Sequence, residues 1–238
     1  MPETVAPAPP ALNPAGVAVA LEALFPQAVV AAELHGTAPA GLLTESEARA
    51  VSHCAPKRIA DFTAGRLCAR RALEAFGVRD FPLLPAEDRQ PQWPQGYVGS
   101  ITHTEGYSAA VVGRRAQFRS LGVDAEAIAA VHAELWPRIL GEGERRQLAQ
   151  LPTPQERLRC AALIFAAKEA FYKCQFALTA EWLEFEDLHI ESEDFGRDTG
   201  QFSVRPCRPL RLGHTGPAIQ GRFRVHAPYV SCGVALPQ

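Results

Sequence analysis

Two long helical patterns, each accompanied by short β-rich runs, restrict the possible folds of this chain more than any other feature. The first pattern opens after Pro56 and runs to Gly77, a residue type that commonly ends helices. The second runs from about Pro154 to Phe176. In the first pattern the apolar residues recur at helical spacings and form one stripe, made of Ile59, Phe62, Ala69, Leu73 and Phe76.

β-rich runs surround the two helices. Four are expected up to residue 124, at 27–34, 97–102, 107–112 and 118–124. The second and third are separated by the hairpin punctuation His103-Thr104-Glu105-Gly106, and Thr44 with Glu47 has the capping-box pattern of a helix start. Four more are expected at 188–191, 201–204, 219–225 and 229–236. Each half thus combines one dominant helix with several antiparallel strands, which predicts an α+β fold.

The length of 238 residues allows one large domain or two of about 120 residues each. We expect three parts: a flexible tail rich in proline and alanine over 1–16, an N-terminal half over 17–119 and a C-terminal half over 120–238. The similarity between the two halves is too weak to prove a duplication from the sequence.

Composition excludes several classes of protein. The 24 basic and 26 acidic side chains give a formal charge of −2, which makes no general case for binding nucleic acid or a membrane surface. No stretch approaches the roughly 20 apolar residues of a membrane helix, and the N-terminus lacks the positive leader of a signal peptide. Since the six cysteines form no C-x-x-C pattern, we expect buried thiols in a cytoplasmic protein.

Positive charge is carried almost entirely by arginine. Of the 24 basic residues only three are lysine, namely Lys57, Lys168 and Lys173. A GC-rich genome explains why lysine is scarce, but it does not explain where these three residues lie.

Three carboxylates could act with these lysines. Asp124 and Glu126 point the same way if they end a strand, although a solvated strand end is the more frequent meaning of such a pair. Glu169 and Lys173 share a helix face, either as an ordinary surface ion pair or as a partly buried one. The apolar neighbours Phe165, Ala166, Ala167, Phe171 and Tyr172 favour the buried alternative. Three carboxylates and one or two lysines suit a site for phosphate and Mg²⁺.

A second group of cations could also receive phosphate. It consists of Arg58, Arg66, Arg70, Arg71, Arg89 and His103. A solvated helix face explains the arginines equally well, and a single histidine at a turn is usually structural.

Five short motifs follow one another between residues 57 and 173. They are Gly65-Arg66-Leu67-Cys68-Ala69-Arg70, Asp88-Arg89-Gln90-Pro91-Gln92-Trp93-Pro94, Gly99-Ser100-Ile101-Thr102-His103, Gly122-Val123-Asp124-Ala125-Glu126 and Phe165-Ala166-Ala167-Lys168-Glu169-Ala170-Phe171-Tyr172-Lys173. Their order and spacing resemble the 4′-phosphopantetheinyl transferase superfamily. The similarity is greatest to its bacterial branch that activates siderophore-synthetase and broad-range carrier proteins.

The resemblance implies a monomer of two similar α/β halves, a pseudo-dimer with coenzyme A and Mg²⁺ at the junction. Such an enzyme transfers phosphopantetheine from coenzyme A to a serine hydroxyl of an apo acyl or peptidyl carrier protein and releases adenosine 3′,5′-bisphosphate. The carriers belong to fatty-acid, polyketide or siderophore synthesis, and the sequence does not say which of them are served.

The resemblance also implies roles for individual residues. Asp124, Glu126 and Glu169 would hold Mg²⁺, and the catalytic residues would be Glu169, Lys173 and His103. Glu169 would accept the serine proton directly or through a metal-bound water. Residues implied for binding coenzyme A are Arg58, Arg66, Arg89, Gln90, Thr102, His103, Lys168 and Lys173. Among these, Arg58 and Arg66 would take the 3′-phosphate.

Two departures and two alternatives qualify this assignment. Ala166-Ala167 stands where some members have serine, and Gln90 stands where others have a cation, which puts one nucleotide contact in doubt. One alternative is a non-catalytic module that binds coenzyme A or a carrier on the same scaffold; the other is a metal-dependent phosphatase or nucleotidyl hydrolase. Retention of the three carboxylates with Lys173 favours the transferase.

A docking surface for the carrier is also expected. Carrier helices are generally acidic, so the basic stretch from Trp136 to Leu151 is a candidate, while a solvated helix face is an equally good explanation. The arginines concerned are Arg138, Arg145, Arg146, Arg157 and Arg159.

Overall fold

The two helical patterns form the two long helices of the chain, α2 (Pro56–Glu74) and α5 (Pro154–Thr179). A computed structural model describes residues 21–39, 41–213 and 218–238, so the tail expected over 1–16 lies outside the described residues. Pro56 occupies the first turn of α2, and Gly77, at φ 80°, follows its end as predicted. Helix α5 continues beyond the predicted Phe176 to Thr179.

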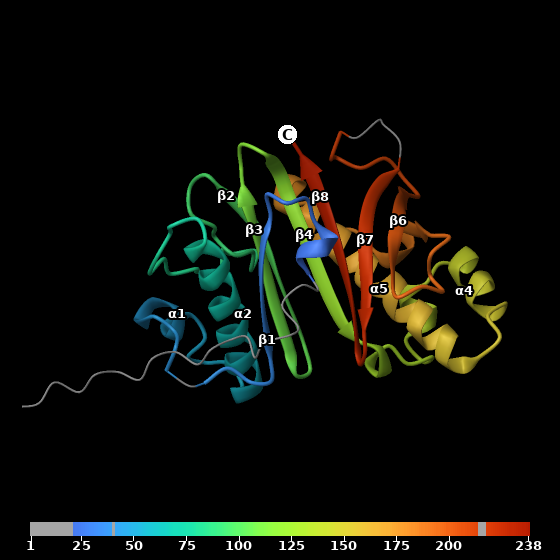
Figure 1. The fold of residues 1–238 in the computed structure, drawn as a ribbon, viewed down its shortest axis with the longest axis horizontal. Helices are drawn as coiled ribbons and strands as arrows, with labels where there is room; N and C mark the ends of the chain where they lie inside the picture. Colours follow the sequence, from blue (N-terminus) through green and yellow to red (C-terminus); the bar gives the residue numbers. More distant parts are fainter. Residues whose placement is uncertain (1–20, 40, 214–217) are drawn as a thin grey trace, which may run out of the picture.

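The strands form two antiparallel sheets, which makes the fold α+β as predicted (Figure 1). The first sheet has the order β1-β3-β2, with β1 (Val30–His35), β2 (Tyr97–Thr104) and β3 (Tyr107–Arg114). The second has the order β4-β8-β7-β6-β5, with β4 (Phe118–Ala127), β5 (Leu188–Glu191), β6 (Thr199–Pro206), β7 (Ile219–His226) and β8 (Tyr229–Pro237). The change from one sheet to the other falls in the connection between β3 and β4.

Short helices fill the connections. They are η1 (Glu22–Leu24), α1 (Glu45–Ala50), η2 (Ile128–Ala130), α3 (Trp136–Ile139), α4 (Glu142–Ala149) and η3 (Phe185–Asp187). The predicted capping box is present at α1, where the Thr44 side chain accepts from the Glu47 N–H and Glu47 accepts from the Thr44 N–H. Within the described ranges, every helix is too short or too polar to cross a lipid bilayer.

The hairpin differs from expectation at two residues, His103 and Thr104. Strand β2 extends through Thr104, so the turn is Glu105-Gly106 and His103 lies on the strand instead of in the turn. The register explains this, because His103 is paired with Ser108 and Thr104 with Tyr107. The side chain of His103 therefore has an orientation fixed by a strand.

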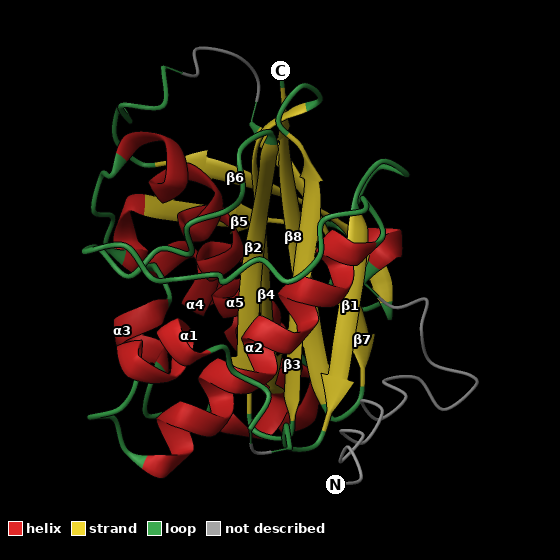
Figure 2. Ribbon diagram, turned by 90° about the vertical axis from the view of Figure 1, so that its left-hand side faces the viewer, coloured by secondary structure: helices red, strands yellow, loops and turns green. Residues whose placement is uncertain are grey.

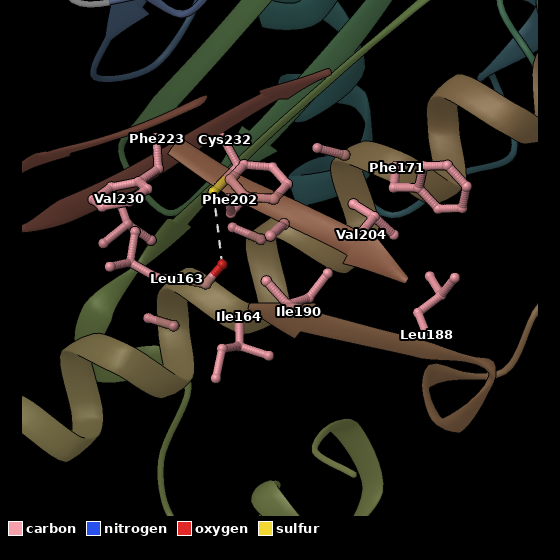
Figure 3. Packing of buried hydrophobic residues seen from close by; sticks show 14 of the residues in the cluster. Leu163, Ile164, Phe171, Leu188, Ile190, Phe202, Val204, Phe223, Val230 and Cys232 are labelled. Atoms are coloured by element: carbon pink, nitrogen blue, oxygen red, sulfur yellow. Dashed lines mark hydrogen bonds between the residues drawn. The ribbon is translucent and has the colours of Figure 1, made fainter. Parts of the chain in front are cut away.

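Each long helix packs against its own sheet. Helix α2 crosses the strands of the first sheet on the near side in Figure 2, with Phe62, Ala69 and Leu73 of the predicted stripe buried. Helix α5 contributes Leu163 and Phe171 to a large core that it shares with the second sheet (Figure 3). Because both the sheet and neighbouring short helices cover α5, the helix is apolar nearly all round its middle.

A glycine lets α5 lie directly on β4. A Cβ atom at Gly122 would overlap the carbonyl oxygen of Ala170 and crowd Cys174. Since the backbones approach so closely here, the residues that follow Gly122 on β4 are brought beside the side chains at 169 and 173 on α5.

Strands β2 and β4 lie side by side and join the two sheets through side-chain hydroxyls. Ser100 Oγ accepts from the Val123 N–H at 3.1 Å, Thr102 Oγ1 from Ala125 at 3.0 Å and Thr104 Oγ1 from Ala127 at 3.3 Å. Alternate residues of β2 thus bind alternate residues of β4, as the two-residue period of strands requires. This seam holds the N-terminal half against the strand that carries Asp124 and Glu126.

Candidate active site

The seam orients the two carboxylates of β4. Asp124 is 3% exposed, and its Oδ1 accepts from Thr102 Oγ1 at 3.0 Å. Its other oxygen, Oδ2, is buried and lacks a hydrogen-bond partner. Glu126 points to the same side of the strand, and its Oε2 accepts from Thr104 Oγ1 at 3.4 Å. The predicted convergence of these side chains on one face is therefore present.

Helix α5 brings an ammonium group to this pair of carboxylates. Lys173 Nζ donates to Asp124 Oδ1 at 2.6 Å and to the Val123 carbonyl at 3.3 Å. Glu169 lies one turn earlier on the same helix face and is partly buried. The short ion pair of Lys173 is thus with Asp124, a residue 49 positions away, and not with Glu169, the helical neighbour that the sequence indicated, which acts on Lys173 through its charge.

The three carboxylates disturb one another electrostatically. Burial, followed by the charge of Asp124, raises the pKa of Glu126 to about 8, and the same two causes raise the pKa of Glu169. Burial alone would lower the pKa of Lys173, but the neighbouring carboxylates, Asp124 foremost, raise it. Three acids around one ammonium repel one another when ionised, and a divalent cation would relieve this repulsion.

The donor chemistry fits Mg²⁺. All three side chains offer carboxylate oxygens, and Asp124 Oδ2 is a buried oxygen that still needs a partner. Within the described part of the chain, no three His, Cys, Asp or Glu side chains already surround a single point closely enough to enclose a metal ion. Mg²⁺ does not require such a cage, because proteins usually bind it through one or two carboxylates, with substrate phosphates and water completing the shell.

A cavity of about 390 Å³ opens beside Lys173 and is lined by both halves of the chain. From the N-terminal half come Arg58, Arg66, Arg89, Gln90 and His103; from the C-terminal half come Tyr172, Lys173, Phe176 and Trp182. Six of the nine residues predicted for catalysis, coenzyme binding or both therefore meet in one cavity. Its cations and aromatic rings suit a ligand with phosphates and a base.

Two cations of the N-terminal half have well-defined contacts in this cavity. Arg58 Nη1 lies 3.2 Å from His103 Nε2. Arg66 donates from Nε to the Leu83 carbonyl at 2.8 Å and stacks 3.9 Å above the Phe62 ring. Burial lowers the pKa of Arg66 to about 10, so this guanidinium stays charged at neutral pH.

His103 has a lowered pKa. Burial is the largest cause, and the positive charges of Lys173 and Arg58 act in the same direction against the pull of Asp61. At neutral pH the imidazole is therefore predominantly uncharged. It can bind a phosphate oxygen through an N–H group without adding positive charge.

The predicted coenzyme contact of Lys168 is not supported, because its ammonium is used inside the protein. Nζ donates to Glu144 Oε2 at 2.7 Å, to the Ile139 carbonyl at 3.0 Å and to the Phe185 carbonyl at 2.9 Å. These three bonds use all three donors of a fully buried side chain. Lys168 therefore supports the C-terminal half and has no donor left for a ligand.

Thr102 and Arg70 also have structural contacts in place of the expected phosphate contact. Thr102 is 1% exposed, and its hydroxyl is shared between Asp124 and the Ala125 N–H. It acts on the site by holding Asp124. Arg70 belongs to the suspected phosphate-binding cluster, but its Nη1 donates to the buried Glu47 at 2.6 Å and its Nη2 to the Leu42 carbonyl.

Sequence reasoning missed Trp182 and the apolar pocket beside Glu169. This pocket, of about 250 Å³, is lined by Tyr172, Trp182, Leu183, Phe185 and Leu188, together with Lys168, Glu169 and Glu184. Trp182 follows the end of α5 and lines both cavities. No periodic pattern marks such a residue, since its side chain is 68% exposed and belongs to a loop.

Comparison with known proteins shows which family the chain resembles. The model of the 4′-phosphopantetheinyl transferase N-terminal domain matches residues 46–113, and the model of the 4′-phosphopantetheinyl transferase superfamily matches residues 120–222. The chain is 39% identical over 226 residues to the 4′-phosphopantetheinyl transferase PptT of Mycobacterium tuberculosis, covering 92% of this chain and 97% of that protein.

Two further relatives extend the comparison. The 4′-phosphopantetheinyl transferase Svp of Streptomyces mobaraensis is 35% identical over 77% of this chain and 71% of its own length. Enterobactin synthase component D of Salmonella typhi is 40% identical over 49% of this chain and 48% of its own length. The chain belongs to the 4′-phosphopantetheinyl transferase superfamily, in its siderophore-synthetase and broad-range branch.

Proposed function

We propose that this phosphopantetheinyl transferase takes its phosphopantetheine from coenzyme A and attaches it to a serine hydroxyl of an apo carrier protein, releasing adenosine 3′,5′-bisphosphate. One observation supports the proposal above all others. The arginine- and histidine-lined cavity of the N-terminal half ends at Lys173, which pairs with Asp124 and lies within the electrostatic influence of Glu126 and Glu169. A diphosphate in this cavity would have cations on one side and a cation-binding acidic cluster on the other.

The two cavities match the two ends of coenzyme A. Arg58, Arg66 and Arg89 offer charge for the 3′-phosphate and the nucleotide, while His103 and Lys173 offer donors for the diphosphate. The apolar pocket adjoining Glu169 suits the largely uncharged pantetheine arm. Trp182 stands between the two sites because it lines both of them.

Asp124, Glu126 and Glu169 are the residues that would hold Mg²⁺. When bound, the cation would neutralise the diphosphate and stabilise the charge of the leaving group. Asp124 Oδ2, with no protein partner, is the oxygen best prepared for this contact.

The protein's own groups can then perform the transfer by positioning and proton movement. The serine oxygen forms a bond to the phosphorus that carries pantetheine, and the bond from this phosphorus to the bridging oxygen breaks. Glu169, whose raised pKa makes it a better proton acceptor than an ordinary glutamate, takes the serine proton. Lys173 lies beside the developing charge and, since Asp124 and the other carboxylates hold its pKa above the usual value, stays protonated.

A direct assay tests this function. The protein is incubated with coenzyme A, Mg²⁺ and several unrelated apo carrier proteins, and each carrier is analysed by mass spectrometry. The expected result is addition of one phosphopantetheine to the acceptor serine with release of adenosine 3′,5′-bisphosphate. If coenzyme A is consumed without a carrier, the chain is a hydrolase. If no carrier gains mass, the proposed function is wrong.

The choice of carrier, the oligomeric state and the compartment are parts of the same proposal. We expect peptidyl carriers of siderophore synthesis to be substrates and place fatty-acid carriers second; kcat/KM over a carrier panel tests the order. A monomer suffices, because both walls of the cavity come from one chain. The free cysteines suit a reducing compartment such as the cytoplasm.

The docking surface expected over Trp136–Leu151 also stays a prediction. Arg138 and Arg145 line a hollow there, but Glu142 and Glu186 line it too. Arg146 pairs with Glu142 at 2.6 Å and Arg159 with Asp198 at 3.1 Å, so both are engaged locally. Charge reversal at Arg138, compared with charge reversal at Arg146, tests this surface through the KM for the carrier.

A further inference from the structure

Trp182 exposes a large apolar indole to water beside the two cavities. Its side chain is 68% exposed, and it packs edge-on against Tyr172 with ring centroids 5.7 Å apart. It lines both the large cavity and the apolar pocket beside Glu169. An indole left in water gives up the free energy that burial would supply, so a ligand that covers it gains affinity. The position of Trp182 therefore matters for binding.

Local contacts fix that position only in part, through the hydrogen bonds from the Glu181 N–H to Thr179 Oγ1 at 3.1 Å and from the Trp182 indole to Glu184. Trp182 comes two residues after Ala180, which ends α5 in the left-handed region at φ 49°. The next regular element is the short helix η3. A connection of this kind needs contacts from elsewhere in the chain to hold one conformation.

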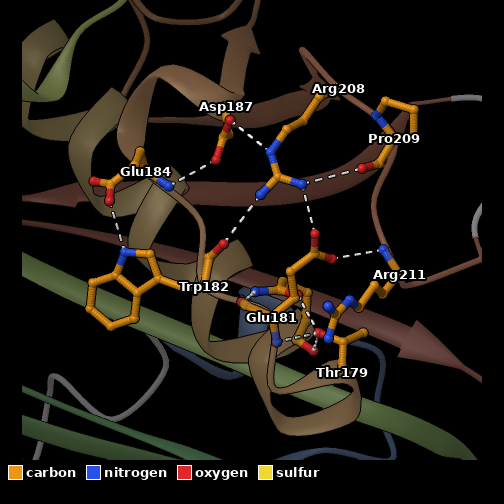
Figure 4. A network of polar contacts seen from close by, with 9 residues as sticks. Thr179, Glu181, Trp182, Glu184, Asp187, Arg208, Pro209 and Arg211 are labelled. Carbon is orange, nitrogen blue, oxygen red and sulfur yellow. Dashed lines mark hydrogen bonds and ion pairs between the residues drawn. The ribbon is translucent and has the colours of Figure 1, made fainter.

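Arg208, which lies two residues beyond the end of β6 at Pro206, provides these contacts (Figure 4). Its Nε donates to Asp187 Oδ1 at 2.9 Å, and its Nη1 donates to Glu181 Oε1 at 2.6 Å. Its Nη2 donates to the carbonyl of Trp182 at 3.2 Å. One guanidinium thus binds both ends of the segment 181–187 and the backbone of the tryptophan between them.

Further contacts complete the arrangement around the segment. Glu181 Oε2 accepts from the Arg211 N–H at 2.7 Å, and the indole N–H of Trp182 donates to Glu184 Oε1 at 2.9 Å. Hydrogen bonds to Arg208 lower the pKa of Glu181, and Arg208 acts in the same direction on Asp187, so both carboxylates are charged at neutral pH. The clamp formed by Arg208, Glu181 and Asp187 therefore has its full charge under working conditions.

We propose that Arg208 is a positioning residue for ligand binding, which acts by holding Trp182 between the two cavities. The inference rests on the proposed function, because it takes coenzyme A as the ligand that covers the indole. Arginine suits this geometry because its three nitrogens, fixed in one plane, each meet a different acceptor, in Asp187, Glu181 and Trp182. The predicted consequence is a loss of affinity for coenzyme A, with little change in kcat at saturating coenzyme A.

A double-mutant cycle tests the proposal. The variants are Arg208→Gln, Trp182→Ala and the double variant, with coenzyme A binding measured by calorimetry and KM and kcat measured separately. We expect Arg208→Gln to weaken binding about fivefold to tenfold, and the double variant to bind no more weakly than Trp182→Ala. Arg208→Lys should recover less than half of the coenzyme A affinity that Arg208→Gln loses.

Arg205→Gln is the matched control. Arg205 is another arginine of the same strand region, and its Nε pairs with Glu191 at 2.6 Å, away from the segment 181–187. It should bind coenzyme A as the wild type does. Additive losses in the cycle, unchanged affinity in Arg208→Gln, or an equal loss in Arg205→Gln would each overturn the proposal.

The outcome is separable from that of the proposed function. Calorimetry with coenzyme A requires no carrier, so an additive cycle in an active enzyme rejects only the role of Arg208. A wild-type protein that binds coenzyme A but modifies no carrier rejects only the transfer reaction.

Discussion

The two lysines of α5 lie five residues apart and differ in burial and in their ion pairs. Lys168 is fully buried, and each of its three donors has an acceptor in Glu144, Ile139 or Phe185. Lys173 is 30% exposed and faces a carboxylate, Asp124, that keeps one oxygen without a partner. One ion pair is complete within the protein, whereas the other belongs to a cluster of three carboxylates that repel one another when ionised.

The difference teaches how to distinguish a structural charge from a functional one. A buried charge whose partners are all supplied by the protein stabilises the fold or its specificity and has nothing left for a ligand. A cluster with an unsatisfied oxygen and raised carboxylate pKa values is typical of a binding or catalytic site. Five variants would break or sharpen this comparison, from the largest expected effect to the smallest.

Glu169→Gln should abolish transfer, with kcat reduced at least about 1,000-fold, or roughly 4 kcal/mol in activation free energy. The amide keeps the shape of the side chain but cannot accept the serine proton and is a weak ligand for Mg²⁺. Single-turnover assays measure the loss, and circular dichroism checks the fold. A folded and active variant would remove Glu169 from both roles.

Lys168→Met should destabilise the protein by about 3–5 kcal/mol, because Glu144 is left as an unpaired buried charge. The midpoint of thermal unfolding should fall by roughly 6–20 °C. Adding Glu144→Gln should recover part of the loss. Molecules that remain folded should keep most of their kcat. A stable but inactive Lys168→Met variant would show that Lys168 has a direct role in the active site.

Lys173→Arg should lose most of the activity, about tenfold to 100-fold in kcat. The guanidinium keeps the charge, but it is larger and planar and does not fit the position between Asp124 Oδ1 and the Val123 carbonyl. Coenzyme A binding should change much less than kcat. Near-normal turnover would show that lysine persists here by chance.

Thr102→Val should raise the Mg²⁺ concentration needed for half-maximal activity by roughly fivefold. Valine keeps the shape of threonine but removes the hydrogen bond to Asp124 and the acceptor for the Ala125 N–H, at a cost of about 1–3 kcal/mol. Titration with Mg²⁺ and thermal unfolding separate the two effects. An unaltered requirement for Mg²⁺ would limit the threonine to joining the sheets.

Lys57→Met is the control lysine. Its Nζ pairs with Asp61 at 3.1 Å across one exposed turn of α2, and its side chain is 79% exposed. Removing the pair should change stability by no more than about 0.5 kcal/mol and leave kcat unaltered. A large loss of coenzyme A affinity would instead place Lys57 among the phosphate contacts.

The elements of the fold were largely predictable. The apolar stripe from Ile59 to Phe76, the capping box at Thr44 and the hairpin around Gly106 are local patterns, and each is found in the structure, with Ile59 and Phe76 at the ends of the stripe only half-buried. The misplaced detail, His103 and Thr104 in a turn, arose because the end of a strand depends on its pairing partners, here Ser108 and Tyr107. The register of a hairpin is set by the type and length of its turn, which the turn-forming residues alone do not specify.

The active site was also predictable only where its residues are close together in the sequence. Asp124 with Glu126, and Glu169 with Lys173, follow from the periods of strands and helices. The helical period also indicates that Lys168 points elsewhere, since five residues turn a helix by roughly 140° relative to Lys173. The partner of Lys168 on that side of the helix is Glu144. It could not be deduced, because 24 residues separate the two in sequence.

The sequence by itself therefore determined the two helices, the alternation of strands and the identity of the chemically able side chains, since these depend on neighbours within a few residues. Tertiary structure alone decided which lysine lines the large cavity, which carboxylate oxygen lacks a partner and where Trp182 lies. Those properties depend on burial and on contacts such as Gly122 against Ala170 and Arg208 against Glu181, which join distant segments. A charged side chain can bind a ligand only when the protein leaves some of its donors or acceptors without a partner, and tertiary packing determines which ones are left.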